Sequence, residues 1–254
     1  MSDGVLTMEQ LGDAIVVLTL NRPDRRNALS IELMDALCET LEAFASQEQF
    51  RVVILRGAGT VFCAGLDLHE AAEAELAERS AMCVARTFQT LCDFPQVTIA
   101  AAHGAAFAGG AGLMACCDFV IASDDLKVCF PEVRRGLVPA LATVALGARM
   151  RDGDRRELLL LGEPVDARRA LGMGLVDRVV PADQVMAAVL EIAATVLKGG
   201  PHAVQQTKRL LRELAPVDRH HLFARALEFH SRARHGDEAR EGLAAFHERR
   251  EPNW

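Results

Sequence analysis

Short runs of aliphatic residues alternate with amphipathic stretches of helical period from the N-terminus to about Pro181. Apolar runs of strand length that alternate with helices predict an α/β protein whose helices cover a sheet. Ser30 precedes one of these helices and is expected to cap it, since a Ser hydroxyl accepts a hydrogen bond from a first-turn amide. The expected strands are 14–21, 51–57, 96–104, 118–125 and 174–181, and the expected helices are 31–47, 78–94 and 166–174.

The pattern changes after Pro181, where consecutive helices are expected to the end of the chain. We therefore predict two parts: residues 1–195 as the core that carries the site, and residues 196–254 as a helical region. Several of the later helices would expose apolar faces on a lone chain, which favours contacts between subunits. The expected helices are 182–200, 201–215, 219–235 and 236–253.

Composition narrows the classes of function. Of the 254 residues, 50% are hydrophobic and 25% are charged, which is typical of an ordinary globular protein. The net charge of -7 disfavours a nucleic-acid surface. We find neither a signal peptide nor an apolar run of the ~20 residues that a membrane span needs, so we expect a cytoplasmic protein. The seven cysteines form no CxxC pair and are expected to be buried free thiols.

Two glycine-containing loops are the strongest functional signal. The sequence GGAG at residues 109–112 precedes a helix, and Gly65 in FCAGLDL follows the expected strand 51–57 and is expected just before a helix start. Glycine lets a ligand approach the backbone, and the first amides of a helix lack partners within it. Neither loop has the P-loop or dinucleotide-binding spacing. The glycines alone fit tight helix packing as well as a ligand site, but two such loops could each supply one amide to an oxyanion hole.

Five segments, in order, resemble the motifs of the enoyl-CoA hydratase/isomerase superfamily, the crotonases. The resemblance extends from about Ala14 to the C-terminus, and its segments are 62–68, 101–118, 130–139, 159–181 and 237–252. It implies an α/β fold made of a spiral of ββα units, with two roughly perpendicular sheets and a helical C-terminal region for trimerisation and active-site cover. It also implies an acyl-CoA substrate, lipid metabolism of the β-oxidation type, and a homotrimer or a dimer of trimers. Coenzyme A is then part of the substrate, and no separate cofactor, metal, nucleic acid or membrane is expected.

The resemblance assigns roles by motif position. The backbone amides of Leu66 and Gly109 are the implied oxyanion donors, and Glu132 is the implied acid/base. Arginines in the RPDRRNAL turn could meet the CoA phosphates, although a solvated turn explains them equally well. The implied substrate-binding residues are Arg25, Arg26, Ala28, Ala64, Asp67, Leu68, His69, Gly110 and Gly112.

Gly112 departs from the two-carboxylate hydratases, which have a second Glu at that position. Glu132 lies between apolar residues, so partial burial should raise its pKa, although a surface acid at a helix start is the alternative. None of the nearby polar residues obviously replaces the missing acid, and Cys63 has no partner base that would mark a nucleophile. The nearby polar residues considered are Asp67, His69, Glu70 and His103.

One carboxylate leaves several reactions open. Hydration of an enoyl-CoA through an enolate is the preferred hypothesis, and a 3,2-enoyl-CoA isomerase or an acyl-CoA decarboxylase is the alternative. A non-enzymatic CoA- or RNA-binding member is disfavoured by the acidic charge and by the retained Glu132. The acyl pocket is expected between residues 71–87 and 133–144, and the acyl group itself is left open.

Overall fold

A six-stranded sheet forms the centre of the protein in the computed structural model, which describes residues 4–67, 69–70, 73–147, 149–214 and 219–254. The strand order is β1-β2-β3-β4-β6-β9, and every neighbouring pair except β1–β2 is parallel. The strands are β1 (Leu6–Leu11), β2 (Ile15–Leu20), β3 (Val52–Gly57), β4 (Val97–Ala102), β6 (Phe119–Ser123) and β9 (Arg178–Val180).

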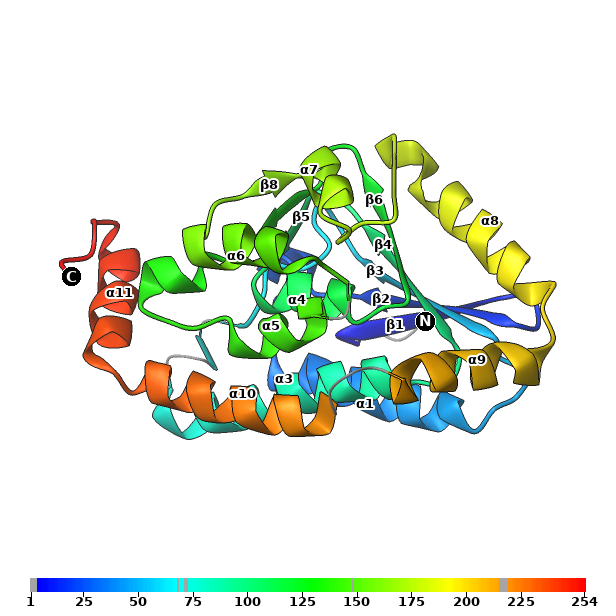
Figure 1. The fold of residues 1–254 in the computed structure, drawn as a ribbon, viewed down its shortest axis with the longest axis horizontal. Coiled ribbons are helices and arrows are strands. Elements are labelled where there is room, and N and C mark those ends of the chain that lie inside the picture. Colours follow the sequence, from blue (N-terminus) through cyan, green and yellow to red (C-terminus); the bar gives the residue numbers. More distant parts are fainter. Residues whose placement is uncertain (1–3, 68, 71–72, 148, 215–218) are drawn as a thin grey trace.

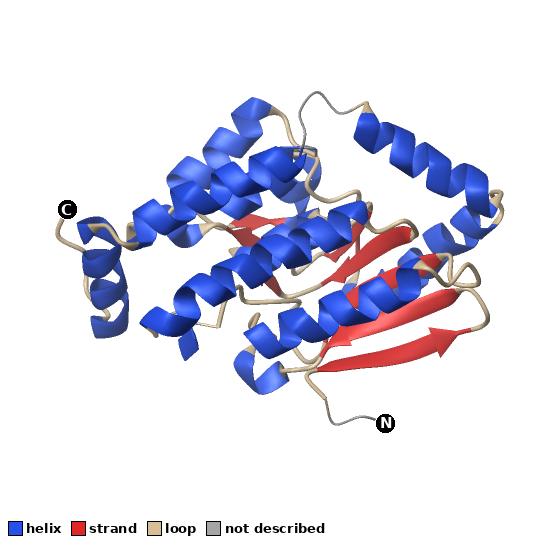
Figure 2. Cartoon of the chain, turned by 90° about the horizontal axis from the view of Figure 1, so that it is seen from below, coloured by secondary structure: helices blue, strands red, loops and turns tan. Residues whose placement is uncertain are grey.

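Helices cover both faces of this sheet (Figures 1 and 2). In β2, alternate residues such as Val16 and Leu18 face the cluster that includes α1 (Ile31–Ala45). Ile15 and Val17 face the opposite cluster, which α8 (Val185–Leu197) completes. Because the strand period is two, covering both faces buries every residue of β2, as is typical of parallel sheets.

A second, smaller sheet holds three short strands in the order β5-β7-β8. β5 (Ala105–Phe107) pairs in parallel with β7 (Lys127–Cys129), and β7 pairs antiparallel with β8 (Val165–Asp166). Two sheets with flanking helices and a helical C-terminal region confirm the predicted fold class.

The remaining helices surround the small sheet and extend the chain toward its C-terminus. α10 packs against α3 and α5, and α11 lies beyond them at the left end of the molecule in Figure 1. These helices are α3 (Ala74–Asp93), α4 (Gly109–Ala115), α5 (Ala140–Gly147), α6 (Asp152–Leu161), α7 (Ala167–Gly172), α9 (Pro201–Glu213), α10 (Arg219–Arg234) and α11 (Asp237–Glu248). Three 3-10 helices accompany them: η1 (Pro23–Arg25), η2 (Pro131–Arg135) and η3 (Ala182–Gln184).

Most sequence-based elements are confirmed, with shifted bounds. The Ser30 side chain accepts a hydrogen bond from the Leu33 amide at 3.2 Å, which confirms the predicted cap of α1. The helix expected from residue 78 already begins at Ala74. A helix start close after Gly65 is confirmed with a shift: Leu66 first forms a parallel bridge with Leu29, and the first described helical residues after Gly65 are 69–70.

Several elements were not predicted. β1 carries exposed residues at its centre and therefore lacks an apolar run. α5 is apolar on nearly all sides because α4, α6 and α10 surround it, so it shows little helical amphipathicity. The three strands of the small sheet are too short for the period of two to be recognised in sequence.

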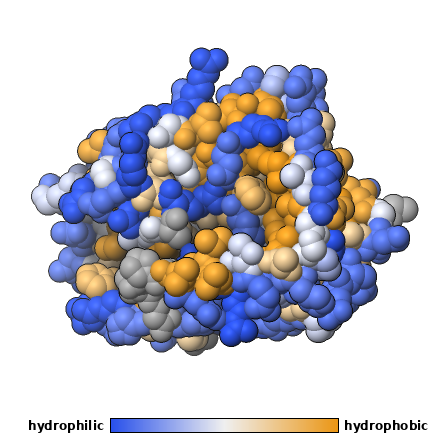
Figure 3. Space-filling view, turned by 45° about the vertical axis from the view of Figure 1, so that its right-hand side comes forward, coloured by the Kyte–Doolittle hydropathy of each residue, from blue (hydrophilic) through white to orange (hydrophobic). Residues whose placement is uncertain are grey.

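Apolar side chains remain at the surface on the side of α8 and α9 (Figure 3). Near the end of α9, Leu210, Leu211 and Leu214 are 54%, 69% and 71% exposed. None of the helices in the described residues combines the length and apolarity needed to cross a bilayer.

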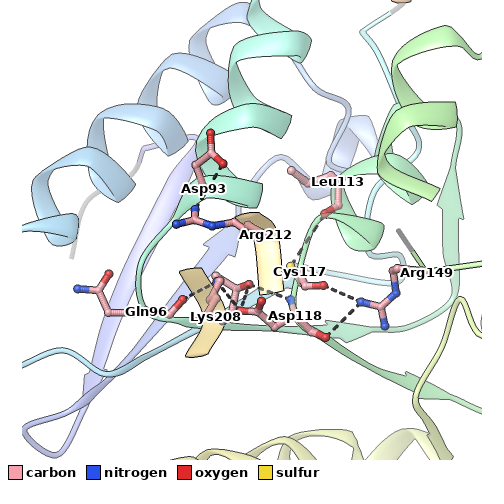
Figure 4. A network of polar contacts seen from close by, with 9 residues as sticks. Asp93, Gln96, Leu113, Cys117, Asp118, Arg149, Lys208 and Arg212 are labelled. Atoms are coloured by element: carbon pink, nitrogen blue, oxygen red, sulfur yellow. Dashed lines mark hydrogen bonds and ion pairs between the residues drawn. The ribbon is translucent and has the colours of Figure 1, made fainter. Parts of the chain in front are cut away.

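A partly buried polar cluster connects α9 to the central sheet (Figure 4). Asp118, at the start of β6, accepts hydrogen bonds from the Thr98 amide at 2.8 Å and the Thr98 hydroxyl at 3.0 Å. The Lys208 ammonium of α9 lies 2.5 Å from the same carboxylate and donates to the Gln96 carbonyl at 2.8 Å. The Lys208 side chain is only 11% exposed, so its charge is compensated within the protein.

Replacing Lys208 should therefore destabilise the fold. We expect Lys208→Met to lower the free energy of unfolding by about 2–3 kcal/mol, because it leaves the Asp118 carboxylate without its cation. Urea denaturation at fixed protein concentration measures the loss. Lys198→Met, at the exposed end of α8, is the matched control, and equal losses in the two variants would contradict the role assigned to Lys208.

Candidate active site

Three loops that are distant in sequence meet at one end of the small sheet. Cys63 forms a parallel bridge with Ala106, and its amide donates to the Ala105 carbonyl at 3.1 Å. Phe107 of β5 is paired with Cys129 of β7 in parallel register. The chain segments that follow Cys63, Phe107 and Cys129 therefore leave this pairing in the same direction and lie close together.

The amides of Leu66 and Gly109 belong to two of these segments. A Cβ built on Gly65 would lie 3.5 Å from the Gly109 nitrogen, and one built on Gly109 would lie 3.9 Å from the Leu66 nitrogen. Gly65 has φ +98°, which favours glycine, and a Cβ there would approach the Phe107 carbonyl oxygen to 2.9 Å. The two backbones are thus in direct contact because a side chain is absent at the point of approach.

In the part of the chain that the structure describes, neither amide donates to the surrounding backbone ladder. Leu29 bonds to the Gly65 carbonyl and the Asp67 amide, so the amide of the intervening Leu66 points away from residue 29. Gly109 is the first residue of α4, and a first-turn amide has no acceptor within its own helix. The preceding Ala108 amide donates to the Cys129 carbonyl at 2.8 Å, which fixes the peptide just before Gly109.

Glu132 lies on the third segment. It is the second residue of η2, which Pro131 begins one residue after β7 ends. Its Oε2 atom is buried and has no hydrogen-bond partner among the described residues. Burial raises the pKa of Glu132 to about 7, while a contact with its own backbone amide and the charge of Arg135 partly offset this effect. A raised pKa is what the apolar neighbours of Glu132 in the sequence predict.

Gly112 faces an aromatic ring. A Cβ at this position would lie 2.6 Å from Cζ and 2.7 Å from Cε2 of Phe88, which is fully buried. The Phe88 ring in turn packs edge-to-face on Phe223, with 6.4 Å between the ring centroids. The space that a second carboxylate would need is therefore filled by the Phe88 side chain.

The other carboxylates near the site have structural partners. Asp67 pairs with Arg22 at 2.8 Å; burial alone would raise the pKa of Asp67, but hydrogen bonds from Arg22 and the His69 amide outweigh burial and lower it. Glu70 accepts a hydrogen bond from the Ile31 amide at 2.8 Å and so caps α1. Neither residue stands in for the missing acid.

The implied CoA-binding residues surround the RPDRRNAL turn. The exposed side chains of Arg25 and His69 contact each other, with 3.3 Å between Nη1 and Nε2. Arg26 has φ +51°, and its carbonyl accepts from the Ala64 amide at 3.0 Å. The Ala28 carbonyl accepts from Arg22 at 2.6 Å.

Three implied contacts remain: Leu68, Gly110 and Gly112. Leu68 is outside the described residues. Gly110 is buried, and a Cβ there would lie 2.3 Å from the Cys63 carbonyl oxygen. In the structure Gly110 and Gly112 serve close packing of α4, against the Cys63 backbone and the Phe88 ring.

Sequence reasoning missed Asn27, which holds two site loops together. Its buried side-chain amide donates to the carbonyls of Ala58 at 2.8 Å and Val61 at 2.9 Å, and its Oδ1 accepts from the Arg22 amide at 3.0 Å. Asn27 has φ +54°, a conformation that Asn tolerates better than most residues. An Asn in an otherwise charged turn was the available signal.

Two other polar candidates, Cys63 and His103, already have backbone hydrogen-bond partners. Burial raises the pKa of Cys63 to about 12, and its thiol donates to the Asn27 carbonyl at 3.1 Å, so this cysteine is not a thiolate nucleophile. The His103 ring contacts the Gly59 carbonyl at 3.0 Å. For chemistry, the described residues offer two backbone amides and one carboxyl group whose Oε2 atom is buried without a hydrogen-bond partner.

Comparison with known proteins identifies the family of this chain. The family model described as enoyl-CoA hydratase/isomerase matches residues 10–254. The chain therefore belongs to the enoyl-CoA hydratase/isomerase family, which comprises lyases and isomerases of the crotonase superfamily.

Individual relatives match over nearly their whole length. The chain is 31% identical to the 2,3-dehydroadipyl-CoA hydratase of Escherichia coli, with 100% of this chain and 99% of that protein covered. It is 33% identical to the carnitinyl-CoA dehydratase of Proteus mirabilis, with 95% of each chain covered. The crystal structure of an enoyl-CoA hydratase from Mycobacterium avium superimposes with a TM-score of 0.90 at 32% identity, covering 100% of both chains.

The contact between Gly112 and Phe88 predicts a stability effect. Gly112→Ala should lower the free energy of unfolding by about 1–3 kcal/mol, because the new methyl group overlaps the Phe88 ring. Combining it with Phe88→Leu should give a smaller loss than the sum of the two single losses. Chemical denaturation measures the energies.

Gly153→Ala is the control for this series. It is also a helical glycine, but a Cβ there has no neighbour within 4 Å. Without a clash, the better helix propensity of Ala should leave the protein as stable or more stable. A Gly112→Ala variant as stable as Gly153→Ala would contradict the described packing.

Proposed function

We propose that this protein is an enoyl-CoA hydratase-like enzyme that acts on an acyl-CoA thioester through an enolate. The Leu66 and Gly109 amides form the oxyanion hole, and Glu132 is the single acid/base. The observation that carries the proposal is the buried Oε2 of Glu132, which has no partner in the described structure and lies on the segment adjacent to both amide loops.

The two amides stabilise the negative charge that develops on the thioester oxygen. When water adds to C3 of an enoyl thioester, or when C2 of a saturated acyl chain loses a proton, the carbonyl oxygen acquires enolate character, and protonation of C2 discharges it. Fixed amide dipoles stabilise this charge without reorganising, and one such donor contributes about 2.7–4 kcal/mol to the transition state. The contact between Gly65 and the 107–109 segment keeps the two donors close together.

Glu132 is the group that accepts and donates the proton. A carboxyl group with a pKa of about 7 exists in both protonation states near neutral pH, so it can accept a proton from carbon or return one. Hydration adds the hydroxyl of water to C3 and a proton to C2, and one carboxyl group can take the proton from water and deliver a proton to C2.

The named relatives favour hydration. The Escherichia coli and Proteus mirabilis proteins are named as a hydratase and a dehydratase of CoA substrates, and addition and loss of water are the two directions of one reaction. An acyl-CoA substrate also suits the exposed Arg25, which could meet a CoA phosphate.

A 3,2-enoyl-CoA isomerase is the second candidate. This reaction moves a proton along the acyl chain and needs only one acid/base. The Phe88 ring beside Gly112 favours it, because the ring occupies the space where a second carboxylate could hold the attacking water. A decarboxylase of the same superfamily would need only the oxyanion hole.

The assembly and location belong to the same proposal. The exposed leucines of α9 support a homotrimer or a dimer of trimers, since burying them requires a partner surface. The acidic net charge is consistent with a cytoplasmic enzyme that acts on a free CoA ester.

Glu132→Gln tests the role of the carboxyl group. It should lower kcat about 10²–10⁴-fold with little change in KM, because the amide keeps the shape but cannot transfer the proton. Hydration is followed as the loss of enoyl-thioester absorbance with crotonyl-CoA, and isomerisation as the gain of this absorbance with a 3-enoyl-CoA.

Glu70→Gln is the matched control, since Glu70 caps α1 and should affect stability more than kcat. A Glu132→Gln enzyme that keeps wild-type kcat on every active substrate would remove Glu132 from the mechanism. Carbon dioxide release from a malonyl-type thioester by this variant would instead support decarboxylation.

The pH dependence follows from the raised pKa. Dehydration of a 3-hydroxyacyl-CoA begins with removal of the C2 proton, which needs the ionised carboxylate. The rate should therefore rise with pH through a midpoint near 7, and one pH unit below the midpoint it should be roughly tenfold lower than its high-pH plateau. A rate that is flat between pH 5.5 and 8 would indicate an ordinary, solvated carboxyl group at the reacting carbon.

A further inference from the structure

The C-terminal helix α11 packs directly on η2, the short helix that carries Glu132. A Cβ on Gly242 of α11 would lie 2.3 Å from the Arg135 carbonyl carbon, and one on Gly136 would lie 2.1 Å from the Glu238 carbonyl oxygen. Gly136 ends η2 with φ +63°. The two backbones thus touch at two glycines, and a displacement of α11 would move η2 or open a gap beside it.

Arg135 connects the two helices through its side chain. Its guanidinium carbon lies 4.0 Å from the centroid of the Phe246 ring of α11, within the range of a cation–π interaction. Burial lowers the pKa of Arg135, and the nearby Glu132 acts in the opposite direction. A partly buried guanidinium held against an aromatic face cannot easily turn into solvent.

Glu132 and Arg135 lie three residues apart in η2, and the 3-10 period places side chains at i and i+3 on the same side of the helix. Burial disfavours the ionised carboxylate of Glu132, and the cation of Arg135 favours it. Two neighbouring ionisable groups are less suited to this role: Arg134 is half exposed and pairs with Glu163, and burial raises the pKa of the Cys129 thiol and keeps it neutral. Arg135 is therefore the positive charge best placed to balance the burial of Glu132.

We propose that Arg135 is a positioning residue for Glu132, and that Phe246 and Gly242 of α11 hold it in place. The C-terminal end of the chain then contributes to proton transfer without touching the substrate. The role of Glu132 in catalysis rests on the proposed function, but the coupling between Arg135 and Glu132 does not.

The test is a direct titration of the Glu132 carboxyl group. The infrared difference between the protein and its Glu132→Gln variant isolates the protonated carboxyl band, and the pH at which this band reaches half its intensity is recorded. Arg135→Met should move that pH upward by about one unit, because the neutral side chain keeps the bulk but removes the charge. Arg135→Lys should restore most of the shift.

Matched variants separate this effect from general damage. Arg134→Met removes a neighbouring exposed charge and should leave the midpoint nearly unchanged. Phe246→Leu should move it upward by less than Arg135→Met does, since the freed guanidinium can turn away from Glu132. Gly242→Ala should move it in the same direction as Phe246→Leu, because the methyl group pushes α11 from η2, and Gly153→Ala should not move it.

Equal midpoints in Arg135→Met and Arg134→Met would overturn the proposal, whatever the activity. If the midpoint moves as expected while Glu132→Gln remains fully active, the coupling stands and the proposed catalytic role of Glu132 fails. If both the coupling and the catalytic role of Glu132 hold, the pH–rate profile of dehydration should shift with the infrared midpoint in every variant. A pH–rate profile that stays fixed while the infrared midpoint moves would contradict the positioning role of Arg135 in proton transfer.

Discussion

The pairing of three backbone segments at the small sheet is the constraint on which the site depends. The parallel register of Phe107 with Cys129, together with the bridge from Cys63 to Ala106, sends three loops from one edge in the same direction. The two unpaired amides and Glu132 come from these loops, although they are up to 66 residues apart in sequence. Backbone hydrogen bonds rather than side chains set the positions of the proposed oxyanion donors, so many side-chain changes leave them intact.

This arrangement requires contacts that only small or unusual residues permit. Gly65 lets one loop touch the next, and Gly110 lets α4 approach the Cys63 carbonyl. The buried side-chain amide of Asn27 donates to backbone carbonyls of the loop at Ala58 and Val61, and so joins this loop to the turn that contains Asn27. Glu132 is the opposite case, since its Oε2 is buried and unpaired. A well-satisfied scaffold around one unsatisfied acid is typical of a site that keeps a group poised for proton transfer.

The sequence predicted what local periodicity and turn chemistry determine. The cap at Ser30, the buried parallel strands and the four C-terminal helices depend on short-range patterns. The small sheet, the fit of Phe88 against Gly112 and the docking of α11 on η2 do not, because each joins segments that approach only in the folded chain. The position of Glu132 after an apolar Phe-Pro pair indicated its burial, but no sequence pattern linked it to Arg135 and Phe246.

The central claim is that the Leu66 and Gly109 amides together polarise the carbonyl of a bound thioester. The most direct measurement is the infrared carbonyl stretch of an acyl-CoA labelled with ¹³C at the thioester carbon, compared free and bound to the Glu132→Gln protein, which should bind without turnover. Two converging donors should shift the bound band to lower frequency than in water, since they weaken the carbonyl double bond. A bound band at or above its frequency in water would contradict the account.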